Sequence, residues 1–121
     1  MGEAVGIVEL YGLVAAFAAA DAGCKAANVT LENFDKNKPG NADALPVPLI
    51  VAIKFRGSVS DVKAAVEAAV RKANEVSGVI TSYIIPRPEA DTEKMLKLSG
   101  LDKSRLHYKK QINNLFKIRR I

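Results

Sequence analysis

Several residue types are absent or rare in this 121-residue chain, and each shortage excludes a class of function. There is no Trp, and aromatic residues make up only 6% of the chain. Cys24 and His107 are the only residues of their types, so the sequence holds neither an internal disulfide nor the ligand spacing of a metal site. We expect Cys24 to be a small buried hydrophobic residue in a reducing compartment.

Catalytic signatures are missing as well. The segment Lys38-Pro39-Gly40 lacks the spacing and the hydroxyl residue of a phosphate-binding loop. Glu9 and Asp21 are the candidates for semi-buried carboxylates, and hydrogen bonding is the favoured role for both. The sequence therefore predicts neither an enzyme nor a cofactor. No apolar run reaches the length of a membrane span, and no secretion leader is recognisable, so we expect a cytosolic protein.

Hydrophobic periodicity predicts six elements in the order β-α-β-β-α-β. A short first strand is expected where Val5 and Ile7 alternate with their neighbours over residues 4–8, followed by a tight turn at residues 11–12. Further strands are expected over residues 29–35, 49–55 and 79–85, with a Pro-containing loop at 36–48. The first helix should begin at Leu13 and end at Asn28 in a left-handed conformation. The second should begin at a Ser58 cap and stop before Gly78. This order predicts a ferredoxin-like α+β domain, an antiparallel sheet with both helices on one face.

Helical spacing also predicts which residues of each helix are buried. For the first helix the expected stripe is Leu13, Ala16, Phe17, Ala20, Cys24 and Ala27. For the second it is Val59, Val62, Val66, Ala69, Val70 and Ala73. The first helix is so rich in Ala that something should pack close to its backbone, either its own sheet or a neighbouring subunit. Ala is also the strongest helix former, which alone would explain the composition.

Charge divides the chain into two parts. Residues 1–93 hold 9 Lys and Arg against 12 Asp and Glu, whereas residues 94–121 hold 9 Lys and Arg and only one acidic residue, Asp102. We therefore expect a domain over residues 1–90 and a basic extension over 91–121 that is helical or partly disordered. The strands lack the aromatic platform of an RNA-binding ferredoxin-like domain, so nucleic acid is an unlikely partner of the body.

Two separated motifs resemble the shell-protein domain of bacterial microcompartments, of the hexamer-forming kind. The first is GIVELYGLVAAFAAADAGCKAANV, and the second is FRGSVSDVKAAVEAAVRKANEVSGVITSYIIPRP. Ser58 replaces the aspartate usual in this family and keeps an oxygen for capping the helix. The resemblance spans residues 3–88, with a looser match over 91–94.

The resemblance implies a structural wall protein in a cytoplasmic bacterial microcompartment. Its subunits would form cyclic homohexamers, tile into sheets with other shell proteins around enclosed enzymes, and leave a central pore in each ring. By residue-level correspondence, Lys25 and Arg87 would lie at the edge between hexamers. In the absence of the resemblance, Lys25 would be read as a solvated lysine at a helix C-terminus, and Arg87 as an ordinary turn residue.

Two segments depart from the family pattern. The pore-lining turn is replaced by the longer loop at 36–48, which we expect either to narrow or cover the pore or to splay over one face. The candidate pore residues are Lys36, Asn37, Lys38, Asn41 and Asp43. The second departure is the basic extension, whose candidate contact residues are Lys109, Lys110, Phe116, Lys117, Arg119 and Arg120.

An amphipathic basic extension has several possible partners. Docking on a protein surface, either the chain's own hexamer or an enclosed enzyme, is favoured over nucleic acid or an anionic membrane. The alternative for the whole chain is an oligomeric regulatory or nucleic-acid-binding protein that acts through this extension.

Overall fold

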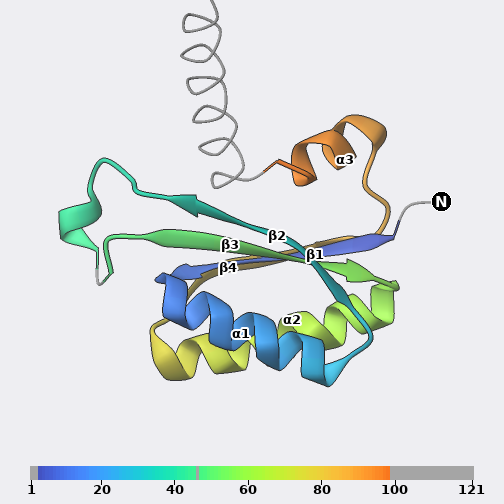
Figure 1. Cartoon of the computed structure of the whole chain (residues 1–121), viewed down its shortest axis with the longest axis horizontal. Coiled ribbons are helices and arrows are strands. Elements are labelled where there is room, and N and C mark those ends of the chain that lie inside the picture. Colours follow the sequence, from blue (N-terminus) through green and yellow to red (C-terminus); the bar gives the residue numbers. More distant parts are fainter. Residues whose placement is uncertain (1–2, 46, 99–121) are drawn as a thin grey trace, which may run out of the picture.

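The computed structural model describes residues 3–45 and 47–98. Its elements are β1 (Ala4–Tyr11), α1 (Leu13–Ala26), β2 (Thr30–Asn37), the short 3-10 helix η1 (Ala42–Ala44), β3 (Ile50–Gly57), α2 (Val59–Val76), β4 (Val79–Ile85) and α3 (Ala90–Leu96). Figure 1 shows a single sheet with α1 and α2 on one face and α3 on the other. The predicted β-α-β-β-α-β order is confirmed, and α3 adds a helix on the other face of the sheet.

The sheet has the strand order β2-β3-β1-β4, with every neighbouring pair antiparallel. Side chains alternate between its faces, so residues paired across strands point the same way. Val8 lies opposite Ile53 and Gly6 opposite Phe55, and this row faces α1 and α2. Val8, Ile53 and Phe55 are fully buried. The ferredoxin-like arrangement expected from the sequence is therefore present.

The small residues of α1 allow the helix to lie close to β3 and α2. A Cβ atom added to Gly23 would lie 2.4 Å from the ring of Phe55, closer than any real contact. Val66 of α2 occupies the space beside Gly6 of β1 in the same way, because a Cβ atom added to Gly6 would lie 2.5 Å from the Val66 side chain. Ala15, Ala16, Ala19 and Ala20 are buried on the same side of α1. The inner side of α1 thus serves the chain's own core, which is one of the two explanations that the composition left open.

The predicted burial stripe of α1 was partly wrong. Ala16 and Ala20 are buried, but Phe17 is 59% exposed and Cys24 is exposed. The true inner side is shifted by one residue, because Ala15, Ala19 and Gly23 also face α2 and β3. The alanine and glycine residues of α1 form its buried side, and its large residues therefore lie on the exposed side.

Two other sequence predictions need correction, and a third is confirmed. α1 ends at Ala26, and within residues 3–45 and 47–98 only glycines have positive φ, so Asn28 is not a left-handed stop. Val59 is 49% exposed, and Ala65 and Ala68 take its place on the buried side of α2. The Ser58 cap is confirmed, because its side chain accepts a hydrogen bond from the Asp61 amide at 3.1 Å.

The described residues contain neither a membrane-spanning helix nor a cluster of metal ligands. None of the helices in this part of the chain is both long and apolar enough to cross a membrane. No group of three or more His, Cys, Asp and Glu side chains there is arranged to hold a metal ion.

Candidate assembly surfaces and pore loop

The strands place two of the predicted site residues at one end of the sheet. Val5 pairs with both Arg56 and Ile85, so β3 and β4 finish at the same end. β2 begins there too, just after α1. Lys25 in the last turn of α1 and Arg87 just after β4 therefore lie at this end, on the right in Figure 1. Both residues are exposed.

Lys25 is held by a neighbour on its own helix. Its Nζ lies 2.8 Å from Oδ2 of Asp21, one turn earlier, and the two side chains are 76% and 61% exposed. The hydrogen bond and charge of Asp21 raise the pKa of Lys25. An ion pair this exposed is weak because water and salt screen it. Lys25 is thus charged, located at a helix C-terminus, and free to exchange Asp21 for acceptors on a partner.

The opposite end of the sheet carries the predicted pore loop, with one correction. Lys36 and Asn37 belong to β2, where they pair with Val51 and Ile50 of β3. The expected loop at 36–48 therefore begins only at Lys38, because the strand pairing outlasts the alternating apolar pattern. All five predicted pore residues are exposed in the structure.

The loop has internal structure of its own. The Ala42 amide donates to the Pro39 carbonyl at 3.1 Å, and the Leu45 amide donates to the Ala42 carbonyl at the same distance. The Leu45 bond and a bond from the Ala44 amide to the Asn41 carbonyl form η1, in which Ala42 is 5% exposed. Asn41 and Asp43 remain exposed on the turn. The segment is therefore a compact turn at the tip of the β2–β3 hairpin, seen on the left in Figure 1.

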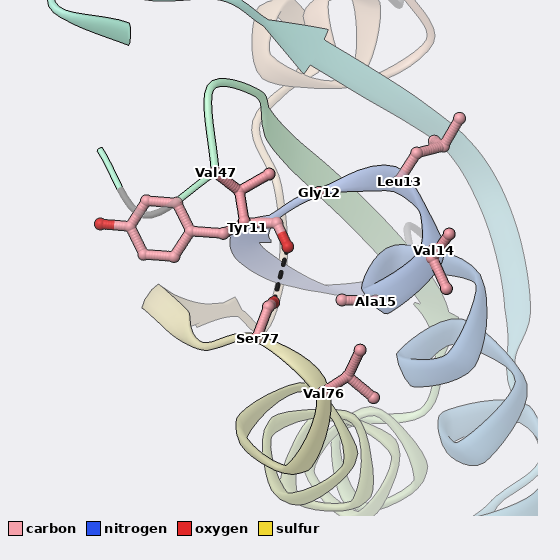
Figure 2. Close-up of a pocket in the computed structure, with 8 residues that line it drawn as sticks. All are labelled: Tyr11, Gly12, Leu13, Val14, Ala15, Val47, Val76 and Ser77. Carbon is pink, nitrogen blue, oxygen red and sulfur yellow. Dashed lines mark hydrogen bonds between the residues drawn. The ribbon is translucent and has the colours of Figure 1, made fainter. Parts of the chain in front are cut away.

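An open cavity lies at the base of this loop (Figure 2). Its volume is about 310 Å³, and it is lined by Tyr11, Gly12, Leu13, Val14, Ala15, Val47, Val76 and Ser77. The Gly12 amide donates to the Leu49 carbonyl at 2.9 Å, and the Ser77 hydroxyl donates to the Tyr11 carbonyl at 2.6 Å. The first bond joins the base of the loop to the start of α1, and the second joins the end of α2 to the end of β1. The lining is mostly apolar and contains no pair of a nucleophile and a general base, so the cavity suits an apolar side chain.

The two sides of the domain differ from each other. β2 and β4 are the edge strands, so each leaves one row of backbone groups without a sheet partner within the described chain. Beside β2, α1 exposes Val14 (77%) and Phe17 (59%), and the Phe17 ring lies 5.1 Å from that of Phe34 in β2. On the other side, β4 exposes Ile80 and Tyr83. Exposed apolar residues therefore occur on both sides, carried by different elements.

Sequence reasoning missed a polar cluster on the face opposite α1 and α2. Lys54 is only 6% exposed, and its Nζ donates to Asn33 Oδ1 at 3.0 Å and to the Leu96 and Leu98 carbonyls at 3.1 and 2.9 Å. It therefore caps the C-terminal end of α3. The available signal was Lys54 itself, a cation that interrupts the apolar residues of β3.

An ion pair holds the start of the same helix. Arg56 Nη2 donates to Glu93 Oε1 at 2.6 Å, and the two side chains are 9% and 26% exposed. Arg56 Nη1 is buried and has no hydrogen-bond partner in the part of the chain that the structure describes. Lys54 and Arg56 together fasten α3 to β3.

Cys24 offers no nucleophilic site. Partial burial and, to a lesser extent, the charge of Asp21 raise the pKa of its thiol, so the unreactive protonated form dominates near neutral pH. The predicted contact residues of the basic extension, from Lys109 to Arg120, lie outside the described residues. The features that remain are surfaces: two dissimilar apolar sides, a charged end and a structured loop.

The comparisons with known proteins identify the family. The family model for the BMC domain matches residues 4–88, and the chain belongs to this family of bacterial microcompartment proteins. It is 43% identical over 94 residues to the microcompartment shell protein PduA of Citrobacter freundii, covering 78% of this chain and 91% of that protein. It is 39% identical over 98 residues to the carboxysome shell protein CcmK2 of Synechocystis sp., covering 79% and 86%.

A solved structure shows the same fold. It is a microcompartment protein from Desulfitobacterium hafniense, with a TM-score of 0.63 and 22% sequence identity. The match covers 78% of this chain and 48% of that one, so this chain spans about half the length of the solved protein.

Proposed function

We propose that this protein is a structural shell subunit of a cytoplasmic bacterial microcompartment. Its copies form cyclic homohexamers that tile, with other shell proteins, into a wall around encapsulated enzymes. The proposal rests above all on the match of residues 4–88 to the BMC domain, together with relatives that are shell proteins. These relatives have a structural role, which favours a protein that is not an enzyme.

The arrangement of surfaces supports a closed ring. A cyclic assembly needs two different surfaces that complement each other on opposite sides of every subunit. The α1–β2 side, with Val14 and Phe17, and the β4 side, with Ile80, meet this requirement. A subunit placed between these two sides has the β2–β3 loop at one end of the sheet, and the end of α1 with Lys25 and the end of β4 with Arg87 at the other. In the proposed ring the loop points to the axis and the charged end forms the rim.

The rim contact joins one hexamer to the next across a two-fold axis. Lys25 would leave Asp21 and donate to backbone carbonyls across the seam. Arg87, exposed between two prolines, offers a planar guanidinium that suits neighbouring carbonyl oxygens.

The pore of each ring would be surrounded by six copies of the loop. Lys36, Asn37, Lys38, Asn41 and Asp43 are the candidate lining residues, and the compact turn around Ala42 narrows the opening. The bond from the Gly12 amide to the Leu49 carbonyl supports this placement, because it fastens the base of the loop to the body.

Oligomeric mass and electron microscopy test the proposal together. Light scattering of the purified protein should give a hexamer, and negative-stain images should show sheets or tubes. Phe17→Glu should disrupt the ring, because it places a charge in a desolvated contact. Lys25→Ala should leave rings intact and abolish sheets, and Lys63→Ala on α2 serves as an exposed control. A wild-type protein that stays monomeric at high concentration overturns the proposal.

One observation favours a second candidate function. The excess of Lys and Arg in residues 94–121 would suit an oligomeric nucleic-acid-binding or regulatory protein that acts through its extension. A salt-sensitive gel shift with DNA or RNA, combined with the absence of sheets, would favour it. Contact of the same extension with encapsulated enzymes is the remaining alternative, which co-purification with and without residues 99–121 would detect.

A further inference from the structure

The sheet face opposite α1 and α2 is only partly covered by α3. The residues that alternate onto this face include Ile7 and Glu9 of β1, Ala52 of β3 and Tyr83 of β4. Ile7 pairs with Lys54, which α3 covers, whereas Tyr83 on the other side of Ile7 is 69% exposed. The covered and uncovered areas are therefore adjacent. We call the uncovered area, formed by Ile7, Glu9, Asp35, Ala52 and Tyr83, the open sheet face.

The described chain leaves the body beside this area. Lys54 Nζ binds the Leu98 carbonyl at 2.9 Å, and Leu98 is the last residue of the described range. Because Lys54 lies next to Ile7 in the sheet, residues 99 onward start at the border of the open sheet face. The buried lysine fixes this starting point, because its ammonium group donates to carbonyls at the end of α3 and to Asn33 of β2.

The open sheet face and the remaining chain carry opposite charges. Asp35 and Glu9 pair with Ala52 from its two sides, so two acidic residues lie in one row across β2, β3 and β1. Residues 99–121 contain seven Lys and Arg and one Asp. Their apolar residues Leu101, Tyr108, Ile112 and Leu115 recur at helical spacing. A strand of eight residues is about 27 Å long, and 23 residues span about 35 Å even as a helix.

We infer that residues 99–121 fold back onto the open sheet face of their own subunit. Their apolar residues pack on Ile7, Ala52 and Tyr83, and their Lys and Arg residues lie near Glu9 and Asp35. The extension then forms a second layer on this side of the sheet, continuous with α3. This inference concerns one subunit and does not depend on the proposed ring.

Tryptophan fluorescence tests the inference directly, because the chain contains no Trp. Tyr83→Trp places a single reporter on the open sheet face, in the full chain and in a chain truncated after Leu98. We expect bluer emission and several-fold weaker acrylamide quenching in the full chain. Phe17→Trp, on the opposite side of the sheet, is the matched control and should respond equally in both lengths. The inference is overturned if the emission and the quenching of Tyr83→Trp are the same in the full and the truncated chains.

A second measurement tests the role of charge. Glu9→Gln with Asp35→Asn should increase trypsin cleavage after Lys109 and Lys110 by roughly two- to fivefold per residue changed, as expected for weak partly exposed pairs. Glu67→Gln on α2 is the control and should leave the cleavage rate unchanged. Cleavage as fast in the full wild-type chain as in an unstructured peptide of residues 99–121 contradicts docking. Light scattering of the same samples reports the ring separately, so the two proposals can fail independently.

Discussion

Removing Glu93 should destabilise the protein far more than removing a neighbouring charge of the same helix. Glu93 accepts from Arg56 Nη2 at 2.6 Å, and the Arg56 side chain is only 9% exposed. Since Arg56 Nη1 already has no partner among the described residues, Glu93→Ala would leave a buried guanidinium without any acceptor on a charged side chain. Breaking a buried ion pair costs about 3 to 5 kcal/mol.

The partial exposure of Glu93 lowers this estimate. Its side chain is 26% exposed, so water can reach part of the site after the substitution. We therefore expect Glu93→Ala to lower the free energy of unfolding by about 2 to 4 kcal/mol. With a urea dependence of about 2 kcal/mol per M, the unfolding midpoint should fall by about 1 to 2 M.

Lys94→Ala is the matched control. Lys94 pairs with Asp91 at 3.5 Å, and both side chains are more than 80% exposed. Its removal should cost no more than about 0.5 kcal/mol. Glu93→Gln keeps an acceptor oxygen, so its loss of unfolding free energy should lie between those of Glu93→Ala and Lys94→Ala. Urea unfolding must be compared at one protein concentration, because assembly adds to apparent stability. Equal midpoints for Glu93→Ala and Lys94→Ala would refute the reasoning.

Three further predictions concern the body of the domain. Gly23→Ala gains about 1 kcal/mol of helix propensity, but its methyl group would clash with the Phe55 ring. We therefore expect thermal or urea unfolding to show a free energy of unfolding lower by about 0 to 2 kcal/mol. A clear gain in stability would contradict the packing described. Cys24 should react with iodoacetamide more slowly than a free thiol near pH 8, because its raised pKa lowers the thiolate fraction. Asp21→Asn should speed the reaction. An unchanged rate in this variant would contradict the role of the carboxylate. Ser58→Ala should lower the free energy of unfolding by about 1 kcal/mol through loss of the α2 cap, whereas the adjacent Ser60→Ala should be nearly neutral.

The order of the elements could be predicted because each has a local signal. Alternation of Leu49, Val51, Ile53 and Phe55 marks β3, and the Ser58 cap marks the start of α2. The orientation of α1 could not be predicted in the same way. A helix covered by alanine on most sides has no dominant apolar stripe, so its rotation depends on which methyl groups and glycines fit against β3 and α2.

The candidate surfaces were predicted in part. The positions of Lys25, Arg87 and the loop followed from the resemblance, and the structure adds that the charged residues and the loop lie at opposite ends of the sheet. Lys54 and Arg56 were missed, because period-two alternation places them on a face that the sequence leaves uncovered. Only a helix more than 30 residues away along the chain explains their burial.

The sequence by itself determined the strands, the two long helices, their order and the family. These depend on local periodicity, capping and two motifs, all of which are written in contiguous residues. Tertiary structure alone decided which side of α1 is buried, how far β2 extends, and how α3 is fastened across β3. Each of these depends on contacts between residues distant in the chain, where close packing and the pairing of buried charges select one arrangement.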